Sequence, residues 1–335
     1  MTTAVAPRAT VRTRPRLMAR SGVARIVVSR LIQLVSVALF VVLVTSVLVH
    51  LVPGDPALAI LGQHATPSSL AALRHQMGLD RSLVSQIGSS VGNIAQGDLG
   101  ASLTQSRSVS SIVFGDLGVT VSVIGLTLVL ALLIGAPLGL LAAVSGNGWI
   151  DKGTRVLCVA LLTLPPFFAG LLLQLLVSLQ LDVAPAGGWG TGWPDNLRYA
   201  WLPALALCCY LVPLITRAVR QAARETLAEP HVEAVIARGI APRAVVFRHV
   251  LPNSLLPVVT LIGFNAAALI GGAVVVEAVF GLPGVGSELV TAVQSRDFPV
   301  VQGIALITAV VVVCVNLITD LVYGFVDPRI RRATS

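Results

Sequence analysis

Charged side chains are scarce in this sequence. Only 11% of its 335 residues are Asp, Glu, Lys or Arg, whereas 55% are hydrophobic. Soluble domains carry roughly 25% charged residues, because water must solvate most of their surface. The shortage of charge therefore excludes an ordinary soluble domain and indicates a chain that lies mostly within a membrane.

Lysine is almost absent, and Lys152 is the single example. A phosphate-binding loop needs the pattern Gly-x4-Gly-Lys-Ser/Thr, and no Gly-Lys pair occurs in the chain. The sequence also lacks the Ser/His/Asp or metal-ligand constellations of a membrane-anchored enzyme. We therefore expect a non-enzymatic protein that binds no cofactor and no metal and does not hydrolyse ATP itself.

Cysteine is rare as well. The four cysteines all fall inside apolar runs and are Cys158, Cys208, Cys209 and Cys314. None is spaced with a histidine as metal ligands would be, and none lies in a polar loop where a disulfide could form. They are expected to be small apolar residues of the core.

Six apolar runs lack Asp, Glu, Lys and Arg and are long enough to cross about 30 Å of hydrocarbon as helices. They cover residues 31–52, 117–150, 156–181, 199–216, 250–276 and 299–319. In lipid each backbone polar group must be paired within the chain, so helices are expected, and the alternation of a β-barrel is absent. The second run is too long for one span and is predicted to end near Val144. The expected fold class is all-α, a polytopic bundle of six transmembrane helices.

Basic residues are distributed unevenly between the two sides of this bundle. Eighteen of the 23 fall in residues 1–30, the 145–155 loop, the 217–251 loop and the C-terminal tail. Cytoplasmic segments carry such an excess, so both termini and the 217–251 loop are predicted to be cytoplasmic, in a plasma membrane. The net charge of +8 then reflects orientation in the membrane and not a nucleic-acid site.

The domain organisation follows from these runs. Residues 1–24 form a basic tail that is expected to be disordered, 25–332 form the membrane domain, and 333–335 are a short tail. The first apolar run exceeds the roughly 7–15 residues of a signal peptide, so it is expected to be a retained span. Proline interrupts the spans, and we expect it to bend or break their helices, at residues 137, 165, 166, 203, 213 and 257.

An insert at residues 53–116 lies on the extracytoplasmic side. Thr66 and Pro67 predict the start of a short amphipathic helix, and Gly78 predicts its end. A turn is expected at 97–100 and a polar loop at 102–111. Insertions of this length are usually functional or disordered. The ordering signals favour a lid on which a partner docks over a plain connection.

The 217–251 loop carries the strongest local signals. Pro230 suits the first turn of a helix and Gly239 its end, while Glu233 and Arg238 complement the helix dipole. A second helix is predicted to start at Pro242. The apolar stripe of the first helix, at 232, 235 and 236, needs a surface, since so short a helix is marginal in water. The bilayer interface and a groove of a cytoplasmic protein both fit this requirement.

This loop resembles the "EAA" loop of ATP-binding-cassette importer permeases. It reads Glu233-Ala234-Val235, three further residues and then Gly239, and it ends in 249–252 as His-Val-Leu-Pro. Residues 25–332 resemble the B-type permease subunit of dipeptide, oligopeptide and nickel importers. The matching segments are Val-Pro-Gly-Asp-Pro at 52–56, Gly-Leu-Asp at 78–80, Gly-Asp-Leu-Gly-Ala-Ser at 97–102, Leu-Leu-Pro-Val-Val-Thr at 255–260, Gly-Gly-Ala-Val-Val-Val-Glu-Ala-Val-Phe at 271–280, Leu-Pro-Gly-Val-Gly at 282–286, Asp-Phe-Pro-Val-Val-Gln-Gly at 297–303 and Val-Asp-Pro-Arg-Ile-Arg at 326–331.

The resemblance implies the fold of a type I importer permease, in which the short helix sits in a cleft of an ATPase subunit. Its implied partners are a homologous second permease, two ATPase chains that bind ATP and Mg, and an extracytoplasmic substrate-binding (lipo)protein. The residues expected to couple this chain to the ATPases are Glu233, Ala234, Arg238, Gly239 and Arg243. Peptides are the cargo most often implied, and nickel chelates, glutathione-like peptides or haem are alternatives.

Four carboxylates on the extracytoplasmic side are candidate contacts for the binding protein or the pathway: Asp55, Asp98, Glu277 and Asp297. Glu277 and Asp297 flank the Gly-rich segment 281–286. The simpler interpretation of these two residues is that they are solvated carboxylates at the ends of membrane spans. The Gly-rich segment itself is expected to be a tight turn or a re-entrant dip. A proton-coupled secondary transporter is a remote alternative, because such proteins usually place ionisable groups inside their spans.

Overall fold

The computed structural model describes residues 18–51, 58, 65–76, 80 and 82–326. Within these ranges the chain is helical apart from loops and one isolated β-bridge between Ala101 and Ser108. The helices are α1 (Met18–Leu51), α3 (Pro67–Gln76), α4 (Leu83–Ala95), α5 (Val109–Val144), α6 (Trp149–Thr163), α7 (Pro166–Leu173), the π-helix η2 (Gln174–Gln180), α8 (Asn196–Leu227), α9 (Pro230–Ala237), α10 (Pro242–Val245), the π-helix η3 (Val246–Val250), α11 (Leu251–Phe280), α12 (Val285–Gln294) and α13 (Phe298–Val326). The predicted all-α class is confirmed.

Five stretches of helix in the described residues are long and apolar enough to cross a membrane, and a bent pair could supply a sixth span. The five lie within α1, α5, α8, the continuous α10–η3–α11 helix and α13. The bent pair is α6 followed by α7 and η2, which meet at 98°. This agrees with a polytopic bundle of six apolar segments.

The third predicted span is not one continuous helix. α6 starts at Trp149, so Lys152 and Arg155 lie on its first turns and not in a loop. It ends at Thr163, and Pro165 is extended, with φ −60° and ψ 142°, because a following proline disfavours helical backbone. The prolines at 137, 203, 213 and 257 all lie inside continuous helices. Only the Pro165-Pro166 pair therefore coincides with a break.

Helices α5 and α8 pack closely along the centre of the bundle. A Cβ at Gly139 would meet the Thr216 carbonyl oxygen at 2.6 Å, so only glycine permits this approach. The Thr216 hydroxyl donates to the Gly135 carbonyl at 3.2 Å across the same interface. Both helices share buried apolar clusters, and a cluster of buried residues also joins α8 to α11. α8 is thus the core helix of the fold.

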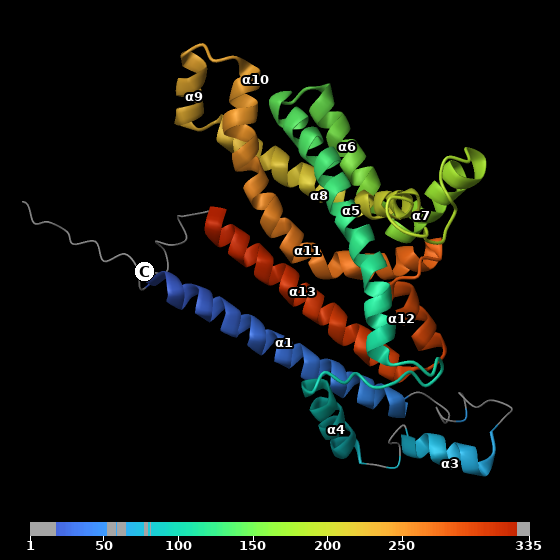
Figure 1. Cartoon of the computed structure of the whole chain (residues 1–335). Coiled ribbons are helices and arrows are strands. Elements are labelled where there is room, and N and C mark those ends of the chain that lie inside the picture. The colour runs from blue at the N-terminus through green and yellow to red at the C-terminus, as the bar shows by residue number, and fades with distance from the viewer. Residues whose placement is uncertain (1–17, 52–57, 59–64, 77–79, 81, 327–335) are drawn as a thin grey trace, which may run out of the picture.

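The outer helices α1 and α13 run side by side (Figure 1). Arg30 of α1 donates from Nη2 to Asp320 Oδ2 of α13 at 2.6 Å, and its Nε donates to the same oxygen at 3.0 Å. This pair, together with the Thr45 hydroxyl that donates to Gln302 Oε1 at 3.3 Å, links two largely apolar helices.

The shorter helices and turns gather at two ends of the bundle (Figure 1). At one end lie α9, α10 and the turn between α5 and α6, which we call the α9 end. At the other lie α3, α4, α12 and the first turns of α5 and α13, which we call the α4 end. The expected start of helix α3 at Pro67 and the end of α5 at Val144 are confirmed, whereas Gly78, the expected end of α3, lies outside the described residues. The predicted loop at 102–111 is too long, since α5 already starts at Val109 behind an N-cap at Ser108.

Candidate functional site

Helix α9 forms where the local signals predicted it. Pro230 occupies its first position, Glu229 is its N-cap, and Arg238 is its C-cap. Gly239 follows with φ +78°, a left-handed conformation that glycine adopts without strain. Pro242 then starts the next helix, as expected. The sequence thus encodes a short helix bounded by two sharp turns.

The inner face of α9 packs on the chain itself. Val232 is 0% exposed and lies in a cluster with Val245, Val250, Ala143 of α5 and Ala223 of α8. Val235 packs against the same cluster, whereas Ile236 is 52% exposed. The expectation that the whole stripe needs a bilayer or a partner is therefore wrong for its first two residues. An eight-residue helix is marginal alone, and this contact holds it in place.

The residues expected to couple lie on α9, in the turn that follows it and on α10. Glu233, Ala234, Arg238, Gly239 and Arg243 are all exposed. In the part of the chain that the structure describes, the charged groups of Glu233, Arg238 and Arg243 form no ion pair. A Cβ at Gly239 would meet nothing within 4 Å, so only its backbone conformation requires glycine. The surface offers both signs of charge and an apolar Ile236 to a partner.

A buried carboxylate fixes the base of this end. Asp151 of α6 is 0% exposed. Arg220 Nε of α8 donates to its Oδ1 at 2.5 Å, and Arg220 Nη2 donates to Oδ2 at 3.0 Å. Oδ2 also accepts from Arg155 at 2.6 Å and from Arg224 at 3.2 Å. Arg224 reaches back to the Gly146 carbonyl in the α5–α6 turn. We call this set the Asp151 clamp.

Sequence reasoning missed the Asp151 clamp. Its local signal is Asp151 followed by Arg155 at i+4, and the matching signal on α8 is Arg220 followed by Arg224. The two pairs are 69 residues apart, from Asp151 to Arg220. The clamp ties the α5–α6 hairpin to α8 just below α9.

At the α4 end, Glu277 is buried and not solvated, which corrects the simpler interpretation. It is 0% exposed, and its Oε2 accepts from the Gly286 N–H at 2.7 Å and the Ser287 N–H at 3.3 Å. These amides belong to the first turn of α12, whose free N–H groups need an acceptor. A Cβ at Gly284 or at Gly286 would overlap this carboxylate.

The Gly-rich segment is therefore a turn followed by a helix, and the helix α12 was not predicted. Gly281 ends α11 with φ 58°, and α12 begins at Val285. Glycine is required here because the Glu277 carboxyl group packs directly on the backbone. This contact fixes α12 against the end of α11.

Asp297 is also buried, at 1% exposure, so it too is not a solvated span end. Its Oδ2 accepts from the Ser102 hydroxyl at 2.5 Å and the Thr104 hydroxyl at 2.8 Å. The N–H groups of Leu103 and Thr104 donate to the same oxygen at 3.0 and 3.1 Å. Asp297 thereby fastens the 102–104 loop to the start of α13. A role of either carboxylate as a partner contact stays a prediction.

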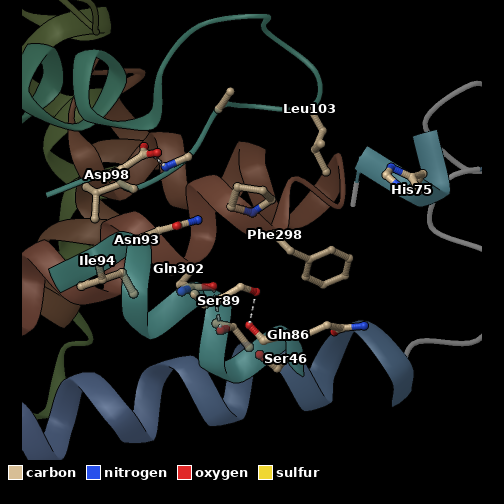
Figure 2. Close-up of a pocket in the computed structure, with 16 residues that line it drawn as sticks. Ser46, His75, Gln86, Ser89, Asn93, Ile94, Asp98, Leu103, Phe298 and Gln302 are labelled. Atoms are coloured by element: carbon tan, nitrogen blue, oxygen red, sulfur yellow. Dashed lines mark hydrogen bonds between the residues drawn. The ribbon is translucent and has the colours of Figure 1, made fainter. Parts of the chain in front are cut away.

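Asp98 is exposed and lines a cavity of about 430 Å³ at the α4 end (Figure 2). Its Oδ1 accepts from the Gly100 N–H at 2.8 Å, within the turn that the sequence predicted at 97–100.

Asp55 lies outside the described residues. Among the described residues no group of three or more His, Cys, Asp or Glu could hold a metal ion. Cys314 is exposed and so is not the core residue that was expected.

Comparison with known proteins covers most of the chain. Residues 135–332 match the family described as binding-protein-dependent transport system inner membrane component. Residues 23–124 match the N-terminal part of membrane components of the same systems.

Curated relatives align over nearly their whole length. A protein of Brucella suis named as a peptide permease is 39% identical over 293 residues, which is 85% of this chain and 92% of the relative. A protein of Escherichia coli named as a D,D-dipeptide transport system permease is 34% identical over 89% of this chain and 95% of its own length. The dipeptide transport system permease protein of Alkalihalophilus pseudofirmus is 30% identical over 90% and 98%. The resemblance of residues 25–332 to permease subunits of peptide importers is thereby confirmed, and the chain belongs to the family of inner-membrane components of binding-protein-dependent transport systems.

Proposed function

We propose that this chain is one permease subunit of an ATP-driven peptide importer in a bacterial plasma membrane. It forms half of the translocation pathway and does not itself hydrolyse ATP. The names of its relatives, which are peptide and dipeptide permeases, support the peptide cargo. The excess of basic residues at the α9 end supports a cytoplasmic location for that end and for both termini.

The observation that carries the proposal is the division of α9 into two faces. Val232 is buried against the chain's own α5 and α8, while Glu233, Ala234, Arg238 and Gly239 remain exposed. The exposed face carries charges of both signs and the apolar Ile236, which together offer a partner both polar and apolar contacts. A short helix in the cleft of a partner would need both a rigid base and such a face.

The Asp151 clamp and the Val232 contact make the base rigid. The clamp joins α6 to α8, and Val232 joins α9 to α5 and α8. A partner that moves α9 must therefore move these helices with it. Two ATPase subunits, each binding ATP and Mg, would act on this chain and on a homologous second permease, and alternate the access of the pathway.

The α4 end would then face the extracytoplasmic binding protein. It carries α3, α4 and the 96–108 loop, which Asp297 fastens to α13. Glu277 and Asp297 are used internally, so Asp98 is the exposed one of the three candidate carboxylates that the structure describes at this end.

The test is ATP hydrolysis by the assembly that co-purifies through a tag on this chain. Hydrolysis is measured with and without a pool of short peptides and the binding protein. Stimulation by peptides supports the proposal. Hydrolysis that ignores peptides but responds to nickel chelates or haem would keep the importer and change its cargo. Failure of any ATPase to co-purify under conditions that preserve membrane complexes would overturn the proposal.

A further inference from the structure

The cavity at the α4 end has the size of a small-ligand site. Its volume of about 430 Å³ lies within the roughly 300–1,000 Å³ of such sites. It is open on one side and lined by residues of α1, α3, α4, α13 and the loop 98–103 (Figure 2). Its walls combine neutral polar side chains with a few apolar ones, including Phe298 and Ile94. No role has so far been given to this cavity.

One wall of the cavity is the free edge of the isolated β-bridge at Ala101. The Ser102 N–H donates to the Arg107 carbonyl at 2.8 Å, and the Val109 N–H donates to the Gly100 carbonyl at 2.9 Å. In such an antiparallel bridge the intervening residue, Ala101, directs its own N–H and C=O to the opposite edge. These two groups have no hydrogen-bond partner in the described ranges, and Ala101 lines the cavity.

Side-chain amides stand around this edge without full partners. The Gln302 Oε1 accepts from Thr45 at 3.3 Å, but its amide nitrogen donates to nothing in the described part of the chain. The side chain of Asn93 likewise has no partner there. Figure 2 shows Asn93 beside Asp98 on the wall opposite His75. Donors and acceptors of both kinds thus converge on one space.

Asp98 is the single carboxylate among the residues that line the cavity. One of its oxygens accepts from Gly100, and the other has no hydrogen bond in the described residues. A free carboxylate oxygen beside amide groups is suited to an ammonium group.

We propose that this cavity binds the amino-terminal residues of a short peptide in extended form. The peptide main chain pairs with the free edge at Ala101, as an added strand does, while its ammonium group meets Asp98. The amides of Asn93 and Gln302 bind the remaining main-chain groups. This assignment rests on the proposed function, which places the cavity on the extracytoplasmic side.

The test is protection of a thiol inside the cavity. Ser90 lines the cavity from α4, and Ser90→Cys is nearly isosteric. Alkylation of residue 90 is followed by mass spectrometry in the assembled importer in nanodiscs without nucleotide. The probes are a pool of tripeptides with free amino termini and the same pool after N-acetylation.

We expect the free peptides to protect residue 90 and acetylation to raise the half-protecting concentration about tenfold, as for the loss of one charge-assisted hydrogen bond. Adding Asp98→Asn should abolish the difference between the two pools. The matched control Asp195→Asn removes a carboxylate that does not line the cavity and should leave the difference unchanged.

The same measurement distinguishes a substrate peptide from a segment of the binding protein as the occupant of the cavity. Protection by the binding protein alone, without any tripeptide, would overturn the assignment to substrate and give the cavity to a segment of that protein. Absence of protection in an assembly whose ATP hydrolysis responds to peptides would overturn the inference and leave the proposed function intact. Absence of both would overturn the two together.

Discussion

Arg220 and Asp151 form a two-point pair, with Nε on Oδ1 at 2.5 Å and Nη2 on Oδ2 at 3.0 Å, between helices that are far apart in sequence. The carboxylate is fully buried, and two further guanidinium groups share it. The pair determines where the α5–α6 hairpin sits on α8.

Replacement of Asp151 by Ala should destabilise the chain strongly. It leaves three guanidinium groups without their shared anion, and breaking a buried pair from one side costs on the order of 3 kcal/mol. Unfolding of the purified chain in detergent, followed by tryptophan fluorescence in denaturant, measures the loss. Asp320→Asn is the control, because the Arg30–Asp320 pair is partly exposed and should contribute less than about 1 kcal/mol. Equal losses in the two variants would contradict the buried clamp.

Replacement of Gly286 by Ala should also be costly. The new Cβ would overlap the Val274 backbone and the Glu277 carboxylate, and forced overpacking costs about 1–3 kcal/mol. Gly125→Ala is the control, since a Cβ at this position meets nothing within 4 Å and alanine favours the helix by about 1 kcal/mol. The same unfolding measurement should move in opposite directions for the two variants, and a loss at both would argue against the close contact.

Replacement of Asp297 by Asn should loosen the 102–104 loop. The neutral amide oxygen accepts more weakly than the carboxylate that now binds four donors. Amide hydrogen exchange at Leu103 and Thr104 should accelerate about tenfold, which corresponds to about 1.4 kcal/mol. Glu288→Gln, which alters the contact of Glu288 with Gln105 but no donor to Asp297, should leave these amides unchanged. Unaltered exchange in the Asp297 variant would mean that the loop is held by other contacts.

Replacement of Val232 by Ala should release α9. Removing two buried methyl groups costs about 2 kcal/mol, and an eight-residue helix cannot persist without its contact. Limited proteolysis within 230–241 should therefore become faster. The control Ile236→Ala removes an exposed side chain and should keep the parental cleavage rate. Faster cleavage in the control alone would reverse the assignment of the two faces.

Replacement of Glu233 by Ala should leave insertion and folding intact and uncouple transport. Its side chain is exposed and forms no ion pair within the described residues, so the fold does not depend on it. If it contacts the ATPase, peptide uptake should fall about tenfold for the loss of one charged contact. Glu225→Ala, an exposed acidic residue at the end of α8, is the control. Full transport by the Glu233 variant would remove this residue from the coupling surface.

Local signals predicted those parts of the fold whose cause is local. Pro230 and Gly239 bound α9, and the N-cap at Thr66, whose hydroxyl accepts from the Ser69 N–H at 3.1 Å, starts α3. The residues expected to couple are all exposed, and their contact with an ATPase stays a prediction. Helix α4 carried a readable signal that went unused, an N-cap at Ser82 before a 3.6-residue apolar pattern.

Long-range contacts account for the errors. Asp297 and Ser102 are 195 residues apart, and no local pattern shows that a loop will cover the carboxylate. Glu277 is buried because α12 folds back on it. The glycines that permit this close contact are typical of turns, so the sequence here did not predict a helix. The apolar stripe of α9 was predicted to pack on a bilayer or a partner. Its first residues instead pack on α8 and on α5, which lies far from α9 in the sequence, so no local pattern shows this contact.

Gly139 gives the central pair of helices a mechanical property. Its backbone rests against the Thr216 carbonyl so closely that α5 and α8 cannot slide past each other without lifting apart. At 1.5 Å per residue, α5 is about 54 Å long and α8 about 48 Å, so together they form a stiff lever with its fulcrum near this contact. A displacement imposed on α8 near this contact would therefore move α5 with it, and α5 begins at the opposite end of the bundle beside α12.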